Sequence, residues 1–344
     1  MRGKPGELIG RGGGRGELAI LERIRTLANR PKNAGIRLGI GDDCALLRLK
    51  PGEELAVTTD LSIAGRHFRL EWHPSEAVGH RTLARGLSDI AAMGARPLAA
   101  FLSLGLPRTL TVAHGRRPAW VEGFFTGLLA LADANHTALA GGDLAESPVA
   151  AADIVLIGAV PRGQALLRSG ARPGDRIFVT GALGGSAAGL ARLREGKRAV
   201  SRASRFNAKS PDPLARHLWP QPRIAQGLWL RRHRVATAAI DLSDGLSTDL
   251  DHLCAESGVS AVIDAAALPI VPGATLEQAL HGGEDYELLF TARPNAIIPR
   301  RIAGVAVTPI GTVVPRRSGK PRVVLLDQSG LRCPMPPGGW QHFS

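Results

Sequence analysis

The stretch Ala239-Ile240-Asp241-Leu242-Ser243-Asp244-Gly245-Leu246-Ser247-Thr248-Asp249-Leu250 marks a change from one kind of secondary structure to another. Residues 235–240 are small or β-branched, which is typical of a buried strand. Leu246, Leu250 and Leu253 then recur at helical spacing, so the chain is expected to turn from strand to helix at residues 241–245. Asp241 and Asp244 are therefore predicted to lie together at the end of a strand.

Two carboxylates that face the same point repel each other unless a proton or a cation lies between them. Mg²⁺ is the natural cation, because it prefers carboxylate oxygens and is usually shared with a phosphate-bearing substrate. The alternative interpretation is structural: Ser243 or Asp244 caps the helix and Asp241 ends a turn. This stretch by itself leaves both interpretations open.

The length of the chain, 344 residues with 44% hydrophobic residues, predicts two domains. The character of the sequence changes at Pro161-Arg162-Gly163, which favours a domain boundary there. This boundary gives an N-terminal domain at 16–161 and a C-terminal domain at 162–344. Residues 1–15, rich in glycine and arginine, are expected to form a flexible leader, and they lack the apolar segment of a secretion signal. Cys44, Cys254 and Cys333 show no paired spacing, which favours a reducing, cytoplasmic location and argues against a zinc site.

The formal charge of +13 suggests an anionic partner. Nucleic acid is not expected, because the arginines are spread along the chain and aromatic residues, at 4%, are too few to form stacking platforms. No apolar run is long enough to span a membrane, so no membrane association is expected either.

Further aspartates follow predicted strands, in the way that places ligand-binding residues on one rim of an α/β sheet. The predicted strands at 36–40, 54–58 and 137–140 run into Asp43, Asp60 and Asp143. Each of these alone is more often an ordinary turn. Asp89 lies near the end of a predicted apolar helix at 74–94, where a buried carboxylate needs a partner unless it faces solvent.

Six carboxylates without a His-Cys cluster suit several Mg²⁺ ions that hold a polyphosphate. They are Asp43, Asp60, Asp89, Asp143, Asp241 and Asp244. The glycines at 181–189 lack the Lys-Ser/Thr of a phosphate-binding loop, and no nucleophile elbow is present. The residues alone thus predict Mg²⁺-dependent phosphoryl transfer without a P-loop.

Seven motifs, in order from about residue 17 to the C-terminus, together resemble those of the thiamine-monophosphate kinase family. They are Gly39-Ile40-Gly41-Asp42-Asp43-Cys44-Ala45, Thr58-Thr59-Asp60, Leu87-Ser88-Asp89-Ile90-Ala91-Ala92-Met93-Gly94, Gly141-Gly142-Asp143, Arg168-Ser169-Gly170 with Pro173-Gly174-Asp175, Asp241-Leu242-Ser243-Asp244-Gly245 and Gly282-Gly283-Glu284-Asp285-Tyr286-Glu287-Leu288. Each motif is weak alone, but the set is specific.

The resemblance implies a two-domain α/β fold of the aminoimidazole-ribonucleotide synthetase type. It implies a homodimer whose N-terminal domains pair their strands into a β-barrel, and a C-terminal α/β domain with a mixed sheet. The implied reaction is direct in-line transfer of the γ-phosphoryl group of ATP to thiamine monophosphate, which yields thiamine diphosphate, the last step of its biosynthesis, and ADP. Because the acceptor is already an oxyanion, no general base is expected.

The resemblance also implies roles for individual residues. Mg²⁺ ions would be held by Asp43, Thr59, Asp60, Asp89, Asp143, Asp241 and Asp244, and ATP would be contacted by Gly142, Asp143, Arg168 and Ser243. The thiamine substrate would be contacted by His67, Asp285 and Trp340, the last by stacking. His67 can also be read as a structural histidine. The sequence departs from the family at Leu144, where a hydroxyl residue is frequent, and at Arg66, where a small or neutral residue is common.

Two other functions remain open at this point. One is a relative with the same fold that uses ATP on another acceptor, such as an aminoimidazole-ribonucleotide or selenophosphate synthetase. The other is a regulatory protein that binds the nucleotide without turnover. The aromatic residue near the C-terminus and the complete set of aspartates favour the thiamine enzyme.

Overall fold

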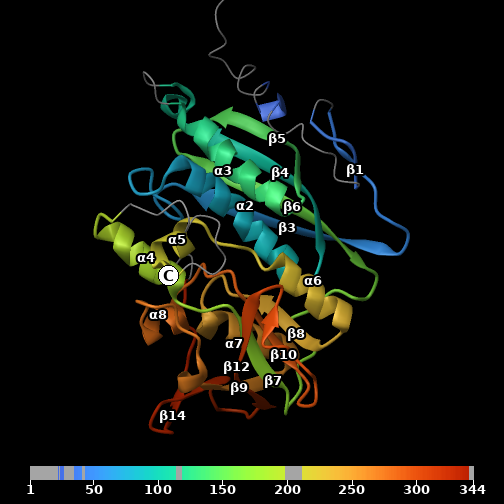
Figure 1. Ribbon diagram of the computed structural model, residues 1–344, viewed down its shortest axis with the longest axis vertical. Helices are drawn as coiled ribbons and strands as arrows, with labels where there is room; N and C mark the ends of the chain where they lie inside the picture. Colours follow the sequence, from blue (N-terminus) through green and yellow to red (C-terminus); the bar gives the residue numbers. More distant parts are fainter. Residues whose placement is uncertain are drawn as a thin grey trace, which may run out of the picture.

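The computed structural model describes residues 22, 24–26, 35–40, 43–113, 118–197 and 211–340. The predicted leader at 1–15 and Asp42 lie outside the described residues. Figure 1 shows two halves, each built on a sheet, that follow one another along the chain. In the part of the chain that is described, no helix has the length and hydropathy needed to cross a membrane.

The first half contains a four-stranded sheet with the order β3-β6-β4-β5, in which only β4 and β5 run parallel. Its strands are β3 Glu53–Ile63, β4 Arg96–Leu106, β5 Ala138–Glu146 and β6 Ala151–Pro161. The helices α2 Ser75–Ala92 and α3 Trp120–Ala134 lie on one face (Figure 1). The short 3-10 helix η1 Arg108–Thr111 precedes α3 in the chain and follows β4. On the other face, Ile36 and Leu47 of the β1–β2 hairpin (Ile36–Leu38 and Leu46–Leu47) pack against Leu98. This hairpin covers only part of that face.

The second half contains a mixed sheet with the order β14-β13-β9-β12-β7-β10-β8, to which β11 is added beside β12. Its strands are β7 Arg176–Thr180, β8 Ala236–Asp241, β9 Val259–Asp264, β10 Leu288–Ala292, β11 Arg301–Ile302, β12 Val305–Pro315, β13 Val323–Leu326 and β14 Arg332–Pro334. Its helices are α4 Gly185–Arg194, α5 Pro213–Leu218, α6 Ile224–His233, α7 Leu246–Ser257, α8 Leu276–His281 and the 3-10 helix η2 Ala265–Ala267. Strand β13 runs parallel to β9, whereas the other neighbours are antiparallel. The prediction of a two-domain α/β chain with a mixed C-terminal sheet is confirmed.

The predicted barrel is not seen in this single chain. Among the described strands, neither main sheet closes on itself, and β3 is paired on one side only, with β6. A barrel made from two copies would need a partner chain, so the homodimer stays a prediction.

Helix α2 lies between the two halves and contacts both α3 and α6. Glycines allow the close approach on each side: a Cβ at Gly127 of α3 would lie 1.8 Å from the carbonyl oxygen of Glu76, and one at Gly227 of α6 would lie 1.9 Å from that of Ala91. The hydrophobic core continues across the contact, since one buried cluster contains Leu87 of α2 together with side chains of the second sheet such as Phe290. The two halves therefore form one packed unit.

The expectation that the aspartates lie at strand ends is right for Asp241, which is the last residue of β8, and wrong for two others. Asp60 lies inside β3 and Asp143 lies inside β5. Strand β3 continues past Asp60 because β6 pairs with it without interruption from residue 53 to residue 63. Tertiary pairing here outweighs the turn propensity of the local sequence.

Candidate functional site

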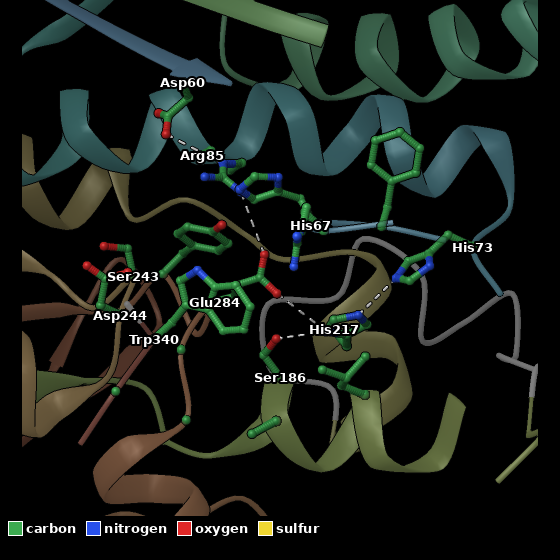
Figure 2. Close-up of a pocket in the computed structure, with 18 of the residues that line it drawn as sticks. Asp60, His67, His73, Arg85, Ser186, His217, Ser243, Asp244, Glu284 and Trp340 are labelled. Carbon is green, nitrogen blue, oxygen red and sulfur yellow. Dashed lines mark hydrogen bonds and ion pairs between the residues drawn. The ribbon is translucent and has the colours of Figure 1, made fainter. Parts of the chain in front are cut away.

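A cavity of about 780 Å³ lies between the two halves (Figure 2). Its walls come from β3 and the segment after it, from α2 and α4, from the turn after β8, and from the loop before β10. Gly338, Gly339 and Trp340 close one side. The cavity thus collects residues from nearly the whole described chain.

Three of the predicted metal ligands approach one another in this cavity. Asp60 comes from β3, Asp89 from the last turns of α2, and Asp241 from the end of β8. Thr58 donates a short hydrogen bond from Oγ1 to Oδ2 of Asp89, and Ser88 donates one of 2.6 Å from Oγ to Oδ2 of Asp241. Neighbouring residues of α2 thereby connect the acidic residues of the two halves.

The acidic residues are electrostatically strained. Burial, together with the charge of Asp89, raises the pKa of Asp60 to about 6 although Arg85 opposes the rise. Burial, with Asp89 and Asp60, raises the pKa of Asp241 to about 7. The pKa of Asp89 is also raised, again mainly by burial. A cation placed among these carboxylates would relieve the repulsion that raises their pKa values.

The turn after β8 is held by a residue that the sequence reasoning missed. Asp249, in the first turn of α7, accepts hydrogen bonds of 3.1 Å at Oδ2 from the backbone N–H groups of Ser243, Asp244 and Gly245. These bonds hold the turn that precedes the helix, whose N-cap residue is Gly245 and whose first turn has no side-chain cap. The capping interpretation is not what the structure shows, and both side chains line the cavity. An acidic residue in the first turn of the helix was the available signal.

A second group of charged residues surrounds Glu284, which also was not predicted. Nη2 of Arg81 lies 2.7 Å from Oε1 of Glu284, and Nη1 of Arg85 lies 3.9 Å from the same oxygen. Burial works to raise the pKa of Glu284, but Arg81 and Arg85 hold it below its usual value. His217 lies behind this carboxylate, with Nδ1 at 4.0 Å from Oε2. Glu284 is the acidic residue of this loop that faces the cavity.

Asp285, the predicted substrate residue, has a different environment. Its carboxylate accepts hydrogen bonds from the backbone N–H groups of Gly184, at 2.6 Å, and Ser186, at 3.0 Å, at the start of α4. Glu284 and Tyr286 both have positive φ, at 67° and 51°, and this unusual backbone sends adjacent side chains in opposite directions. Asp285 therefore supports the cavity wall, and Glu284 is one of the residues that line it.

The other predicted residues are distributed as follows. His67 and Trp340 line the cavity, and Nδ1 of His67 accepts a hydrogen bond from the N–H of Ile63. Arg168 is near enough to lower the pKa values of Asp89 and Asp241 electrostatically. Thr59 is exposed, on the face of β3 opposite to Asp60, as strand alternation requires.

A second cavity, of about 640 Å³, contains the remaining predicted residues, Asp43, Gly142 and Asp143. Its walls are mostly apolar and include Phe101 and Leu144. Gly142 has a φ of 149°, and a Cβ there would lie 2.0 Å from the carbonyl oxygen of Leu102, so only glycine fits. Of the two departures from the family pattern, Leu144 lines this cavity and Arg66 lines the first.

The donor chemistry of the first cavity fits a hard divalent cation. Asp60, Asp89 and Asp241 offer carboxylate oxygens, and burial, the main cause of their raised pKa values, disfavours their charged forms in the absence of a cation. No group of three or more His, Cys, Asp or Glu side chains is already arranged around a metal position in the described ranges. The carboxylates thus have the right chemistry, and their final arrangement depends on the cation.

We expect Asp241→Asn to become progressively more stable than the wild type as the pH rises from about 4 to about 8 in the presence of EDTA. The pKa of Asp241 is about 7 in the folded chain, whereas the usual pKa of an aspartate is 3.8, so between these values the folded state binds the extra proton. The free energy of unfolding of the wild type then falls as the pH rises, whereas asparagine does not titrate. Thermal unfolding of both chains across this range measures the difference, and a difference that is independent of pH would contradict the prediction.

Comparison with models of known protein families identifies the class of protein to which this chain belongs. The family model for the AIR synthase related protein, N-terminal domain, matches residues 41–163, and that for the C-terminal domain matches residues 172–324. The chain is thus an AIR synthase related protein in both halves.

Comparison with individual relatives identifies the particular family within this class. The thiamine-monophosphate kinase of Salmonella typhimurium is 38% identical over 340 residues, which cover 96% of this chain and 98% of that relative. The crystal structure of the thiamine-monophosphate kinase from Stenotrophomonas maltophilia has a TM-score of 0.74 and 38% identity, covering 90% of this chain and 96% of that one. The structure of AaThiL complexed with AMPPCP and TMP has a TM-score of 0.72 and 30% identity, covering 95% and 97%. This chain belongs to the thiamine-monophosphate kinase family.

Proposed function

We infer that this chain transfers the γ-phosphoryl group of ATP to the phosphate of thiamine monophosphate, yielding thiamine diphosphate and ADP. The observation that carries the inference is the acidic group Asp60, Asp89 and Asp241, which meets in one cavity across the two halves. Arg85 and His67 line the same cavity, so it offers groups for a cation and for an anionic substrate. The structure of a family member with AMPPCP and TMP supports the same pair of ligands.

The metal in this proposal is Mg²⁺. When bound, it would neutralise the charge of the polyphosphate and orient the γ-phosphoryl group. Asp60, Asp89, Asp241 and Asp244 are proposed to hold it in the first cavity. Further ligands are proposed from the second cavity and from the outer face of β3, namely Asp43, Asp143 and Thr59.

The substrate roles follow the position of each residue. Ser243, Arg168 and Gly142, with Asp143, are proposed to contact ATP. His67 and Trp340 line the first cavity and are proposed to contact thiamine monophosphate. Asp285 acts on the substrate through the loop that it fixes to α4. No residue needs to remove a proton, because the acceptor oxygen is already anionic and requires only orientation.

The test is ADP release by the purified chain with ATP and Mg²⁺, with thiamine monophosphate, free thiamine or no acceptor, and with chromatography of the products. ADP and thiamine diphosphate formed together, only with the monophosphate, are the expected result. ATP consumption that requires an aminoimidazole ribonucleotide precursor or selenide, and not thiamine monophosphate, would identify a synthetase of the same fold. ATP binding without acceptor-dependent ADP would identify a regulatory protein.

We further propose that the active form is a homodimer joined at the outer face of β3. Leu55, Val57 and Leu61 alternate along this face and are 50%, 59% and 48% exposed. Three large apolar side chains in a row on a strand that pairs on one side only fit a second copy of the same sheet.

We expect Val57→Asp to convert the dimer into a monomer, because a charge at the centre of this apolar row would be buried without a partner. Size-exclusion chromatography with light scattering measures the mass. Ile297→Asp is the matched control, since Ile297 is 89% exposed elsewhere on the surface and its replacement should leave the mass unchanged. A wild type that is monomeric at micromolar concentration would refute the proposed dimer.

A further inference from the structure

Arg85 is a charged residue of the cavity that lies in none of the sequence motifs and has not been assigned to a particular group of either substrate. It lies on α2, and its side chain is only 19% exposed. Figure 2 shows it between Asp60, from the sheet of the first half, and Glu284, from the second half. It is therefore placed where the acidic group and the group around Glu284 meet.

The contacts of Arg85 balance its charge without satisfying its hydrogen-bonding groups. Nε lies 3.5 Å from Oδ1 of Asp60, and Nη1 lies 3.9 Å from Oε1 of Glu284, both longer than the usual charge-assisted hydrogen bond. Nε is buried and has no hydrogen-bond acceptor among the described residues. Burial works to lower the pKa of Arg85, but Tyr286, Asp60 and Glu284 raise it further, so the guanidinium remains charged.

Arg81 lies one turn earlier on α2 and, unlike Arg85, makes close hydrogen bonds that have a structural role. Its Nη2 donates a 2.7 Å hydrogen bond to Oε1 of Glu284, and its Nη1 donates a short one to the backbone carbonyl of His217. Arg81 is thus the residue that fixes Glu284 and joins α2 to α5. Arg85 adds little to that connection, because the oxygen it approaches already has a closer partner.

A buried guanidinium with unused donors suits a tetrahedral oxyanion, which it can bind through two parallel hydrogen bonds. Arg85 lines the same cavity as His67 and Trp340, the residues proposed to contact the acceptor. We propose that Arg85 binds the phosphate group of thiamine monophosphate and is the main residue by which the site distinguishes the monophosphate from free thiamine. This rests on the proposed function, since it assigns the acceptor phosphate of that reaction.

The experiment is calorimetric titration of the full chain with thiamine monophosphate and, separately, with thiamine, in the absence of ATP. We expect Arg85→Gln to weaken binding of the monophosphate by about 10-fold or more, because charge-assisted hydrogen bonds are lost, and to change thiamine binding by less than about 2-fold. Arg85→Lys keeps the positive charge but lacks the planar guanidinium group, so its affinity for the monophosphate should lie between those of the wild type and Arg85→Gln. In kinetics, Arg85→Gln should raise the KM for the monophosphate more than that for ATP.

Arg192→Gln is the matched control, because Arg192 lies on α4, is paired with Asp212 at 2.9 Å, and does not line this cavity. It should bind both ligands as the wild type does. Equal affinity for the monophosphate in wild type and Arg85→Lys, or an equal loss for both ligands in Arg85→Gln, would overturn the proposal. Thermal unfolding shows whether each variant is folded. If Arg85→Gln is not folded, the affinities measured with Arg85→Lys test the proposal. A wild type that makes no thiamine diphosphate would refute the function itself, whereas an active wild type with normally binding Arg85 variants would refute only this inference.

Discussion

Asp241→Asn is expected to lower kcat/KM for thiamine monophosphate by at least about 100-fold, because it removes a carboxylate proposed to hold the Mg²⁺ that neutralises the negative charge of the polyphosphate. Asp241 is buried, ends β8, and interacts electrostatically with both Asp89 and Asp60. Ser88 of α2 donates directly to its Oδ2, which joins the turn of the second half to the helix that carries Asp89. Asparagine has nearly the same volume, so the fold should persist.

Steady-state kinetics over a range of Mg²⁺ concentrations measures this effect, with circular dichroism as the check on folding. Asp251→Asn provides the comparison, because Asp251 is also a partly buried aspartate of the second half but pairs with Arg322 away from the cavity. That variant should retain the activity of the wild type. Near-normal activity of Asp241→Asn at saturating Mg²⁺ would rule out its assignment to the metal.

Glu287→Ala is expected to lower the free energy of unfolding by about 3–5 kcal/mol, the cost of leaving a buried charge without its partner. Glu287 is fully buried and accepts a hydrogen bond of 2.5 Å from Nε of Arg223, another of 3.3 Å from Arg216, and one of 2.7 Å from Oγ1 of Thr180. Arg223 is itself almost completely buried, so the substitution leaves its charge inside the second half.

Urea unfolding measures the loss. Glu195→Ala serves as the reference, because Glu195 forms its ion pair with Lys197 on the surface, and its removal should leave the unfolding midpoint unchanged. If Glu287→Ala unfolded at the same urea concentration as the wild type, the buried pair would not be a major source of stability.

Much of the site could be predicted from local patterns. The strand-to-helix turn at residues 241–245 and the apolar helix that carries Asp89 both have clear periodicity, and the structure places Asp241 and Asp89 in one cavity. These predictions succeeded because the signal and the structure are both local. The resemblance to the family added His67 and Trp340, which line that cavity as well.

Other features depend on contacts between distant parts of the chain. The sequence predicts a strand at 54–58 that ends before Asp60, and only the pairing with β6 shows that the strand continues to residue 63. The side chains of Glu284 and Asp285 point in different directions because Glu284 has a positive φ, which could not be predicted from the sequence. The role proposed for Arg85 rests on its long distances to Asp60 in the first half and Glu284 in the second. The pattern of hydrophobic residues along the sequence carries no information about distances between side chains so far apart in the chain.

Helix α2 also has a consequence for the order of events during synthesis. Its residues 75–92 leave the ribosome long before residues 224–241, which supply α6, β8 and the partner of Ser88. Until then, the side of α2 that contacts α6 and β8 is uncovered, and the core cluster that contains Leu87 still lacks side chains such as Phe290. A growing chain therefore carries an exposed apolar helix face, which is the kind of surface that chaperones protect. The final core and the acidic site are completed at the same late stage of translation.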